Sequence, residues 1–132
     1  MELKKGTFLQ GDKYKIEHII GRGGFGITYL VSQKGLSGYI AVKEFFFREY
    51  CDRADDGVTV IVPSTGSIEL VKRFENKFLK EARLISSLHH SGIVRVSDVF
   101  SENGTSYYTM EYIDGCSLAE YINSNGKLKE DE

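Results

Sequence analysis

The chain has 132 residues, 41% of them hydrophobic, which is enough to bury the core of one small domain and argues against disorder. The formal net charge is −2 and the 17 basic residues are scattered, so we expect no nucleic-acid surface and no membrane contact in this segment. No apolar run reaches the roughly 18 residues that a membrane-spanning helix needs. We therefore expect a soluble, cytoplasmic protein in which Cys51 and Cys116 are reduced thiols, with no metal site.

The first part of the chain predicts a lead-in followed by an antiparallel meander. Residues 1–13 carry the turn signals Gly6 and Gly11, and we expect them to be loosely held. Short apolar runs separated by glycine turns then predict three strands, over residues 14–21, 26–32 and 38–46.

The turn between the first two strands contains four glycines, in the run Gly21-Arg22-Gly23-Gly24-Phe25-Gly26. Its glycines permit positive φ angles and let backbone N–H groups approach phosphate oxygens closely. The spacing GxGxxG is weak evidence by itself, because two different nucleotide folds and many ligand-free hairpins share it. A dinucleotide-binding fold needs a helix after the glycines, whereas residues 27–31 are β-branched and aromatic and predict a strand. The pattern favours a loop that lies over ATP.

The third strand places Lys43 on the same face as the small Ala41 and places Glu44 on the other face. Beneath a glycine loop, Ala41 would leave room for a flat base and Lys43 would reach the phosphates. Without such a loop, Lys43 would be interpreted as an ordinary surface lysine.

The middle of the chain predicts an insertion and then a helix. Turn residues flank an apolar run within residues 48–67, which indicates an inserted loop with one short strand or hairpin. From Ile68 to Leu88, apolar residues recur every three or four positions, as in an amphipathic helix. Glu81 falls inside that apolar stripe, where an unpaired carboxylate is costly to bury, so we expect it to pair with Lys43. The alternative is that Glu81 lies at the exposed edge of a slightly rotated stripe.

The last part of the chain predicts two more strands and a short helix. His89 and His90 are expected to be turn and cap residues, because no other metal-ligating residue is suitably spaced beside them. The strands are expected over residues 93–100 and 106–113, with Asn103-Gly104 as the hairpin turn. Ser117 can cap a helix over residues 118–123.

Taken together, these features resemble the N-terminal lobe of a protein kinase. The shared features are the glycine loop, Ala41-Val42-Lys43 in strand three, Glu81 in the helix and the hinge-like run from Met110 to Gly115. The resemblance implies an α+β fold with a five-stranded antiparallel sheet, one long helix of the αC type and an insertion at about residues 48–67. The expected lobe spans residues 14–126 with a hinge at 110–116, and residues 127–132 form a tail. The run from Gly23 to Leu30 looks most like that of bacterial serine/threonine kinases.

The resemblance also implies roles for individual residues. Lys43 would hold the α and β phosphates of ATP and Glu81 would fix Lys43, so both serve catalysis through geometry. Adenine would pack between Thr28 and Ala41, with Met110 closing the pocket behind it. The full nucleotide-binding set implied is Gly21, Arg22, Gly23, Gly24, Phe25, Gly26, Thr28, Ala41, Lys43, Met110, Glu111 through its C=O, Ile113 through its N–H, and Ser117 near the ribose.

Two departures from the kinase pattern affect the expected function. Thr28 stands where the family usually has valine, which makes the expected adenine site slightly more polar. The sequence contains no kinase catalytic loop and no D-F-G motif, so the Mg²⁺ ligands and the protein-substrate platform are expected in a C-lobe beyond these residues. By this interpretation the chain is a fragment that is inactive alone.

An alternative from another functional class is a pseudokinase or free-standing lobe that acts as an interaction or dimerisation module. It would form homo-oligomers through its exposed lobe surface. The retained glycines, Lys43 and Glu81 argue against it, since a scaffold needs none of them.

Overall fold

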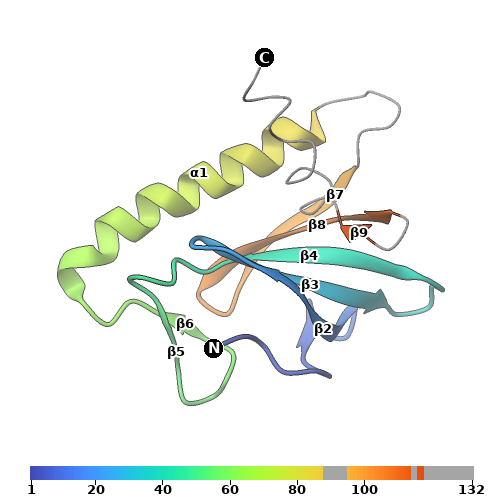
Figure 1. Cartoon of the computed structure of the whole chain (residues 1–132), viewed down its shortest axis with the longest axis horizontal. Coiled ribbons are helices and arrows are strands. Elements are labelled where there is room, and N and C mark those ends of the chain that lie inside the picture. Colours follow the sequence, from blue (N-terminus) through green and yellow to red (C-terminus); the bar gives the residue numbers. More distant parts are fainter. Residues whose placement is uncertain (88–94, 114–115, 118–132) are drawn as a thin grey trace.

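A curled antiparallel sheet carries one long helix, α1, against one of its faces (Figure 1). The computed structural model describes residues 1–87, 95–113 and 116–117. Within these residues the strands of the main sheet run in the order β1-β2-β3-β4-β8-β7, and β9 also pairs with β8. Their bounds are β1 Phe8–Leu9, β2 Tyr14–Arg22, β3 Gly26–Gln33, β4 Tyr39–Phe45, β7 Val96–Glu102, β8 Thr105–Ile113 and β9 Cys116–Ser117.

The five expected strands are all present, as β2, β3, β4, β7 and β8. The expected count of five was too low, because β1 and β9 add to the same sheet. Each of the two has only two residues, too few for an alternating pattern to be recognised in the sequence. The Asn103-Gly104 turn is confirmed: both residues have positive φ angles, 55° and 73°, as a tight hairpin turn requires.

The lead-in is not loosely held, contrary to expectation. Leu3 and Leu9 are buried in the core, and Phe8–Leu9 pairs with the start of β2. The backbone N–H of Gly6 donates to Ile16 O at 2.8 Å, and Ile16 N–H donates to Thr7 O at 2.8 Å. Because this segment packs through a few widely spaced apolar residues, its turn-rich composition concealed its place in the core.

The insertion forms the expected hairpin, with β5 at Asp52–Arg53 and β6 at Val60–Ile61. It is fixed to the turn between β7 and β8, since Val60 N–H donates to Asn103 O at 2.8 Å. A short 3-10 helix, η1 at Thr65–Ser67, leads into α1. Figure 1 shows β5 and β6 near the N-terminus, on the side of the sheet away from α1.

Helix α1 spans Ile68–Ser86 with Ser87 as its C-cap, and the predicted last residue, Leu88, lies outside the described residues. Its buried residues, Val71, Phe78, Ala82 and Ile85, follow the predicted spacing. Phe78 packs on Phe45 of β4 and Tyr108 of β8, with ring centroids 5.5 and 5.0 Å apart. Among the described residues, no helix combines the length and apolarity needed to cross a membrane.

The sheet curls until its outer strands approach one another. The rings of Tyr14 on β2 and Phe100 on β7 stack with centroids 5.9 Å apart, and Tyr14 Oη donates to Asp98 Oδ2 at 2.8 Å. Beyond β1, Gln10 N–H donates to Glu102 Oε1 at 2.8 Å. Several predictions lie outside the described residues: the connection at 88–94 with His89 and His90, the helix at 118–123 and the tail at 127–132.

Candidate functional site

Strand register gathers the predicted site residues of β3, β4 and β8 on one face of the sheet. Lys43 lies opposite Thr28 on β3 and opposite Tyr108 on β8, and Ala41 lies opposite Met110. Directly opposed residues in antiparallel strands share a face, so all five point toward the side covered by α1. All except Lys43 are buried. This set is called the front face below.

The predicted contact between Lys43 and Glu81 is present. Lys43 Nζ lies 3.6 Å from Glu81 Oε1, with 27% of the lysine side chain and 53% of the glutamate side chain exposed. Glu81 therefore lies at the exposed edge of the helix and still reaches Lys43, which combines the two alternatives that the sequence left open. Such an exposed pair is screened by solvent and adds little to stability.

Tyr108 is a third member of this cluster that sequence analysis missed. Its hydroxyl donates to Glu81 Oε1 at 3.0 Å. Burial, followed by the negative charge of Glu81, raises the pKa of Tyr108, so the hydroxyl stays protonated and remains a donor. The signal was available, because Tyr108 is two residues before Met110 on the predicted fifth strand and must share its face.

The glycine loop differs from expectation in its backbone. None of Gly21, Gly23, Gly24 and Gly26 has a positive φ angle. The reason is that the loop tip extends the β3–β4 pairing: Phe46 N–H donates to Phe25 O at 2.9 Å, and Arg48 N–H donates to Gly24 O at 3.0 Å. Gly23 N–H closes the turn by donating to Gly26 O at 2.8 Å.

Gly26 lies where there is little space for a side chain. A Cβ atom there would lie 3.1 Å from Lys43 Cε and 3.1 Å from Glu44 O, which is tighter than ordinary contact. At Gly23 and Gly24 a Cβ would meet nothing closer than 3.9 Å. Among the four loop glycines, Gly26 is therefore the one where an added side chain would be crowded, because the stem of Lys43 and the Glu44 carbonyl lie beside it.

The two side chains of the loop, those of Arg22 and Phe25, contact the lead-in and two other aromatic rings. Arg22 pairs with Glu2 of the lead-in, with Nη2 to Oε1 at 2.8 Å. Phe25 rests on Phe47 and Phe74, with centroid distances of 4.7 and 5.0 Å.

The predicted hinge is described in part. Met110 is buried between Ala41 on β4 and Val96 on β7. Glu111 N–H donates to Arg95 O at 3.2 Å, and its carboxylate accepts from Arg95 N–H at 3.2 Å. The backbones of Ile113 and Ser117 belong to β8 and β9, and Ser117 lies opposite Tyr112. The side chains of Ile113 and Ser117 fall outside the described part of the structure.

The opposite face of β4 carries a buried ion pair that sequence analysis did not identify. Glu44 is fully buried, and the side chain of Arg53 on β5 is only 6% exposed. Two guanidinium nitrogens, Nη1 and Nη2, donate to the two Glu44 oxygens at 2.8 and 2.9 Å. The hydroxyls of Tyr29 and Tyr107 donate to the same carboxylate at 3.0 and 2.6 Å. Glu44 thus has four donors, and we call this group the back-face network.

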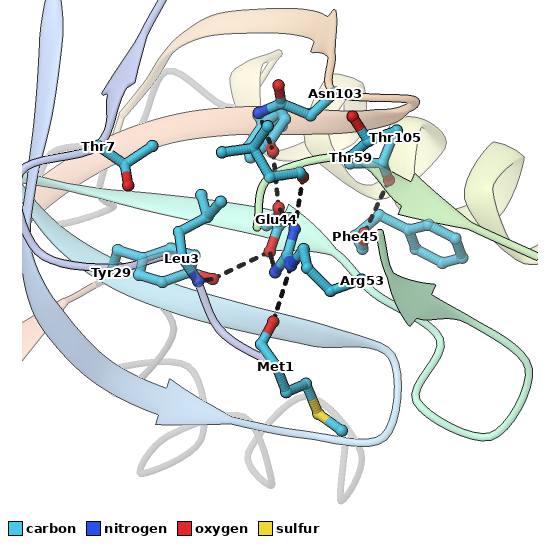
Figure 2. Close-up of polar contacts among 12 residues, drawn as sticks. Met1, Leu3, Thr7, Tyr29, Glu44, Phe45, Arg53, Thr59, Asn103 and Thr105 are labelled. Carbon is cyan, nitrogen blue, oxygen red and sulfur yellow. Dashed lines mark hydrogen bonds and ion pairs between the residues drawn. The ribbon is translucent and has the colours of Figure 1, made fainter. Parts of the chain in front are cut away.

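The back-face network joins the N-terminus and the insertion to the main sheet (Figure 2). Arg53 Nε donates to Met1 O at 2.8 Å, and Arg53 Nη1 also donates to Val58 O at 2.9 Å. Tyr29 Oη accepts from Leu3 N–H at 2.9 Å. The N-terminus and the insertion are therefore attached to the sheet directly behind Lys43.

Comparisons with known proteins identify the family of the chain. The family model described as "Protein kinase domain" matches residues 14–132. A serine/threonine-protein kinase PrkC from Bacillus subtilis is 34% identical over 116 residues, which are 88% of this chain and 15% of that protein. A serine/threonine-protein kinase PknD from Chlamydia pneumoniae is 36% identical over 113 residues, 86% of this chain and 10% of that protein. The chain thus spans about a tenth to a seventh of the length of these curated relatives.

Solved structures show the same fold. The apo form of PpkA-294 superposes with a TM-score of 0.80 at 29% identity, covering 92% of this chain and 42% of that one. A PknI kinase domain from Mycobacterium tuberculosis gives a TM-score of 0.56 at 22% identity over 94% of this chain and 42% of that one. At this identity the second likeness concerns the fold alone. With its N-lobe architecture, a family match over most of its length and bacterial serine/threonine kinases as relatives, the chain belongs to the protein kinase domain family.

Proposed function

We propose that this chain binds ATP between its glycine loop and the front face, as the N-terminal lobe of a serine/threonine protein kinase. The observation that carries the proposal is the contact of Lys43 with Glu81, whose carboxylate also accepts a hydrogen bond from Tyr108, below a glycine that leaves room for the lysine stem. A lysine held by an acid on a helix beneath a glycine-rich turn suits the α and β phosphates of a nucleotide.

Each residue of the proposed site has a separate role in binding the phosphates of ATP. Lys43 supplies the positive charge, and Glu81 and Tyr108 hold that charge in position. The loop from Gly21 to Gly26 supplies backbone N–H groups above the phosphates, and the absence of side chains at Gly23 and Gly24 allows close approach. We assign Lys43 and Glu81 the catalytic positioning roles.

The adenine base of ATP would bind on the front face, beside the phosphate site at Lys43. Ala41 and Thr28 offer a small, buried surface for adenine, and Met110 closes the site behind it. The C=O of Glu111 and the N–H of Ile113 would meet the edge of the base at the proposed hinge, with Ser117 near the ribose. Thr28 makes the surface above the base slightly more polar than valine would.

Bound ATP with Mg²⁺ would supply the γ-phosphoryl group for transfer to a serine or threonine of a protein substrate. We place the Mg²⁺ ligands, the catalytic base and the protein-substrate platform in a second lobe beyond residue 132, so the chain alone is expected to be inactive. The free, buried thiol of Cys51 suits a reducing compartment such as the cytoplasm.

The test is a titration of the 132-residue chain with a fluorescent ATP analogue, compared with its Lys43→Met and Lys80→Met variants. Lys80 lies on the exposed side of α1 and serves as the matched control. We expect Lys43→Met to weaken binding at least about tenfold and Lys80→Met to leave it unchanged, because a charge-assisted contact to phosphate is lost only in the first. Equally tight binding by all three proteins would contradict the site assignment. The kinase proposal itself would fail if the coding sequence after Glu132 held no H-R-D and D-F-G motifs.

A second candidate is an interaction module that self-associates. It is favoured by two exposed apolar side chains on adjoining elements, Leu84 of α1 (65% exposed) and Val99 of β7 (40% exposed). Light scattering of the chain at increasing concentration tests it, and a monomer throughout the range would count against a homo-oligomer.

A further inference from the structure

Three aromatic rings from separate segments meet at the tip of the glycine loop. Phe25 belongs to the loop, Phe47 follows β4 and Phe74 lies on α1. Phe25 stacks on Phe74 with centroids 5.0 Å apart and an interplanar angle of 13°. Phe47 contacts both, at 4.7 Å from Phe25 and 4.9 Å from Phe74. We call these three residues the aromatic latch.

The three rings of the latch differ in burial: Phe47 is buried, whereas Phe25 is partly exposed. Phe47 is buried, and Tyr50 packs edge-on against it at 4.9 Å. Phe25 remains 48% exposed, so its ring can leave the cluster without opening the core. Two backbone hydrogen bonds, Phe46 N–H to Phe25 O and Arg48 N–H to Gly24 O, tie the loop tip to the same segment. The loop is thus held by contacts that are weak enough to break individually.

Helix α1 contacts the loop and the site lysine with the same side. Phe74, Phe78 and Glu81 lie on successive turns of the helix. Phe74 contacts the loop tip, Phe78 packs on Tyr108 with Lys43 Nζ 6.0 Å from its ring centroid, and Glu81 contacts Lys43. A displacement of α1 would therefore disturb both contacts together.

We propose that the aromatic latch couples the glycine loop to α1, so that the loop is held over the phosphates only while Glu81 is in contact with Lys43. Phe74 and Phe47 are then positioning residues, because they act on the nucleotide through Phe25. This inference rests on the proposed function of the site, and it concerns how the site opens and closes.

The first test needs no nucleotide. Amide hydrogen exchange of the 132-residue chain reports on Phe46 N–H and Arg48 N–H, whose acceptors are carbonyls of the loop tip. We expect Phe74→Leu, which keeps an apolar side chain but loses stacking, to speed their exchange at least about fivefold, since removing an aromatic pair weakens the docked state. Leu84→Ala, on the exposed side of the same helix, should leave it unchanged. Unchanged exchange in folded Phe74→Leu and Phe25→Leu variants would overturn the proposal.

The second test is a double-mutant cycle on affinity for the fluorescent ATP analogue. We expect Phe25→Leu and Phe74→Leu each to weaken binding by about three- to tenfold, and the double variant to be no weaker than the worse single one, because both remove the same contact. A purely structural role for Phe74 would lower thermal stability without this non-additivity. Additive losses, or unchanged affinity, would contradict the latch. If Lys43→Met left the affinity for the ATP analogue unchanged, the proposed function would be contradicted. The hydrogen-exchange experiment would still test the aromatic latch, because it uses no nucleotide.

Discussion

Lys43 and Glu44 are neighbours on β4, yet their ion pairs differ in almost every respect. Lys43 lies 3.6 Å from Glu81, and the two side chains are 27% and 53% exposed. Glu44 is fully buried, lies 2.8 Å from Arg53 and accepts from two tyrosines as well. The alternation of a strand sends one charge to the front face and the other into the core. The front pair can therefore form and break at little cost, whereas the back pair is part of the fold.

The back-face network explains how a protein retains a buried charge. Removing a carboxylate from water costs several kcal/mol, and only full hydrogen bonding in good geometry compensates that cost. Glu44 has that compensation from Arg53, Tyr29 and Tyr107. Burial, together with the charge of Glu44, raises the pKa of both tyrosines, which keeps them protonated as donors.

The largest effect is expected from breaking the back pair. Arg53→Met leaves the buried Glu44 charge without its cation, which typically costs about 3–5 kcal/mol of the free energy of unfolding. Urea unfolding followed by circular dichroism measures it. Lys34→Met, which breaks the exposed pair of Lys34 with Asp12, is the control and should have little effect. A loss below about 1 kcal/mol for Arg53→Met would refute the structural role of the pair.

A double variant separates two effects of Arg53→Met: the loss of the attraction between Arg53 and Glu44, and the burial of an unpaired Glu44 carboxylate. In Glu44→Gln/Arg53→Met, the amide oxygen can still accept from a tyrosine but no charge is buried. We expect the double variant to be about 1–2 kcal/mol more stable than Arg53→Met alone, because most of the single-variant loss comes from the uncompensated charge. A double variant less stable than the single one would contradict this explanation.

A smaller loss is expected where the insertion meets the sheet. Gly104 has a φ angle of 73°, and a Cβ there would lie 2.8 Å from Val60 O on β6. We expect Gly104→Ala to lower the free energy of unfolding by about 2–3 kcal/mol, from backbone strain plus the clash. Gly57→Ala is a matched control, since its φ angle is 78° but nothing lies within 4 Å of its Cβ. Equal losses in thermal unfolding would show that the packing of β6 on this turn is unimportant.

The smallest effect on stability is expected at the front face. Lys43→Met keeps most of the apolar stem and removes an exposed ion pair, so the free energy of unfolding should change by less than about 1 kcal/mol. The same urea unfolding experiment measures it beside Arg53→Met. Similar losses in the two variants would contradict the distinction between an exposed pair that adds little to stability and a buried pair on which the fold depends.

The two glutamates also show how far sequence reasoning can reach. The position of Glu81 among the apolar residues of the helix led to the prediction that it pairs with Lys43. The contact is present, although the Glu81 side chain is 53% exposed and not buried as that argument assumed. The same argument could have been applied to Glu44, which shares one face of the predicted third strand with Ile40 and Val42. It would have required a buried cation near Glu44. It would not have named Arg53, because that residue lies in the insertion, where no periodic pattern fixes the side-chain direction.

Other departures have a similar physical origin. The lead-in was expected to be loose because its two buried leucines, Leu3 and Leu9, are too far apart to form a pattern. The loop glycines were expected at positive φ because of their spacing, but hydrogen bonds from Phe46 and Arg48 set the backbone instead. In both cases contacts with distant residues outweighed the local signal.

The sequence by itself determined the five main strands, the long helix and the position of the glycine loop, because each depends on residue spacing within a single element or on two adjoining strands. It also pointed to Glu81 as the partner of Lys43, but the contact itself depends on how α1 packs against the sheet. Tertiary structure alone decided what lies behind Lys43 and where the loop tip rests. Glu44 meets Tyr107 across 63 positions, and Leu3 meets Tyr29 across 26. No local sequence pattern predicts such contacts, because they depend on how the sheet curls and on where the insertion and the N-terminus attach to it.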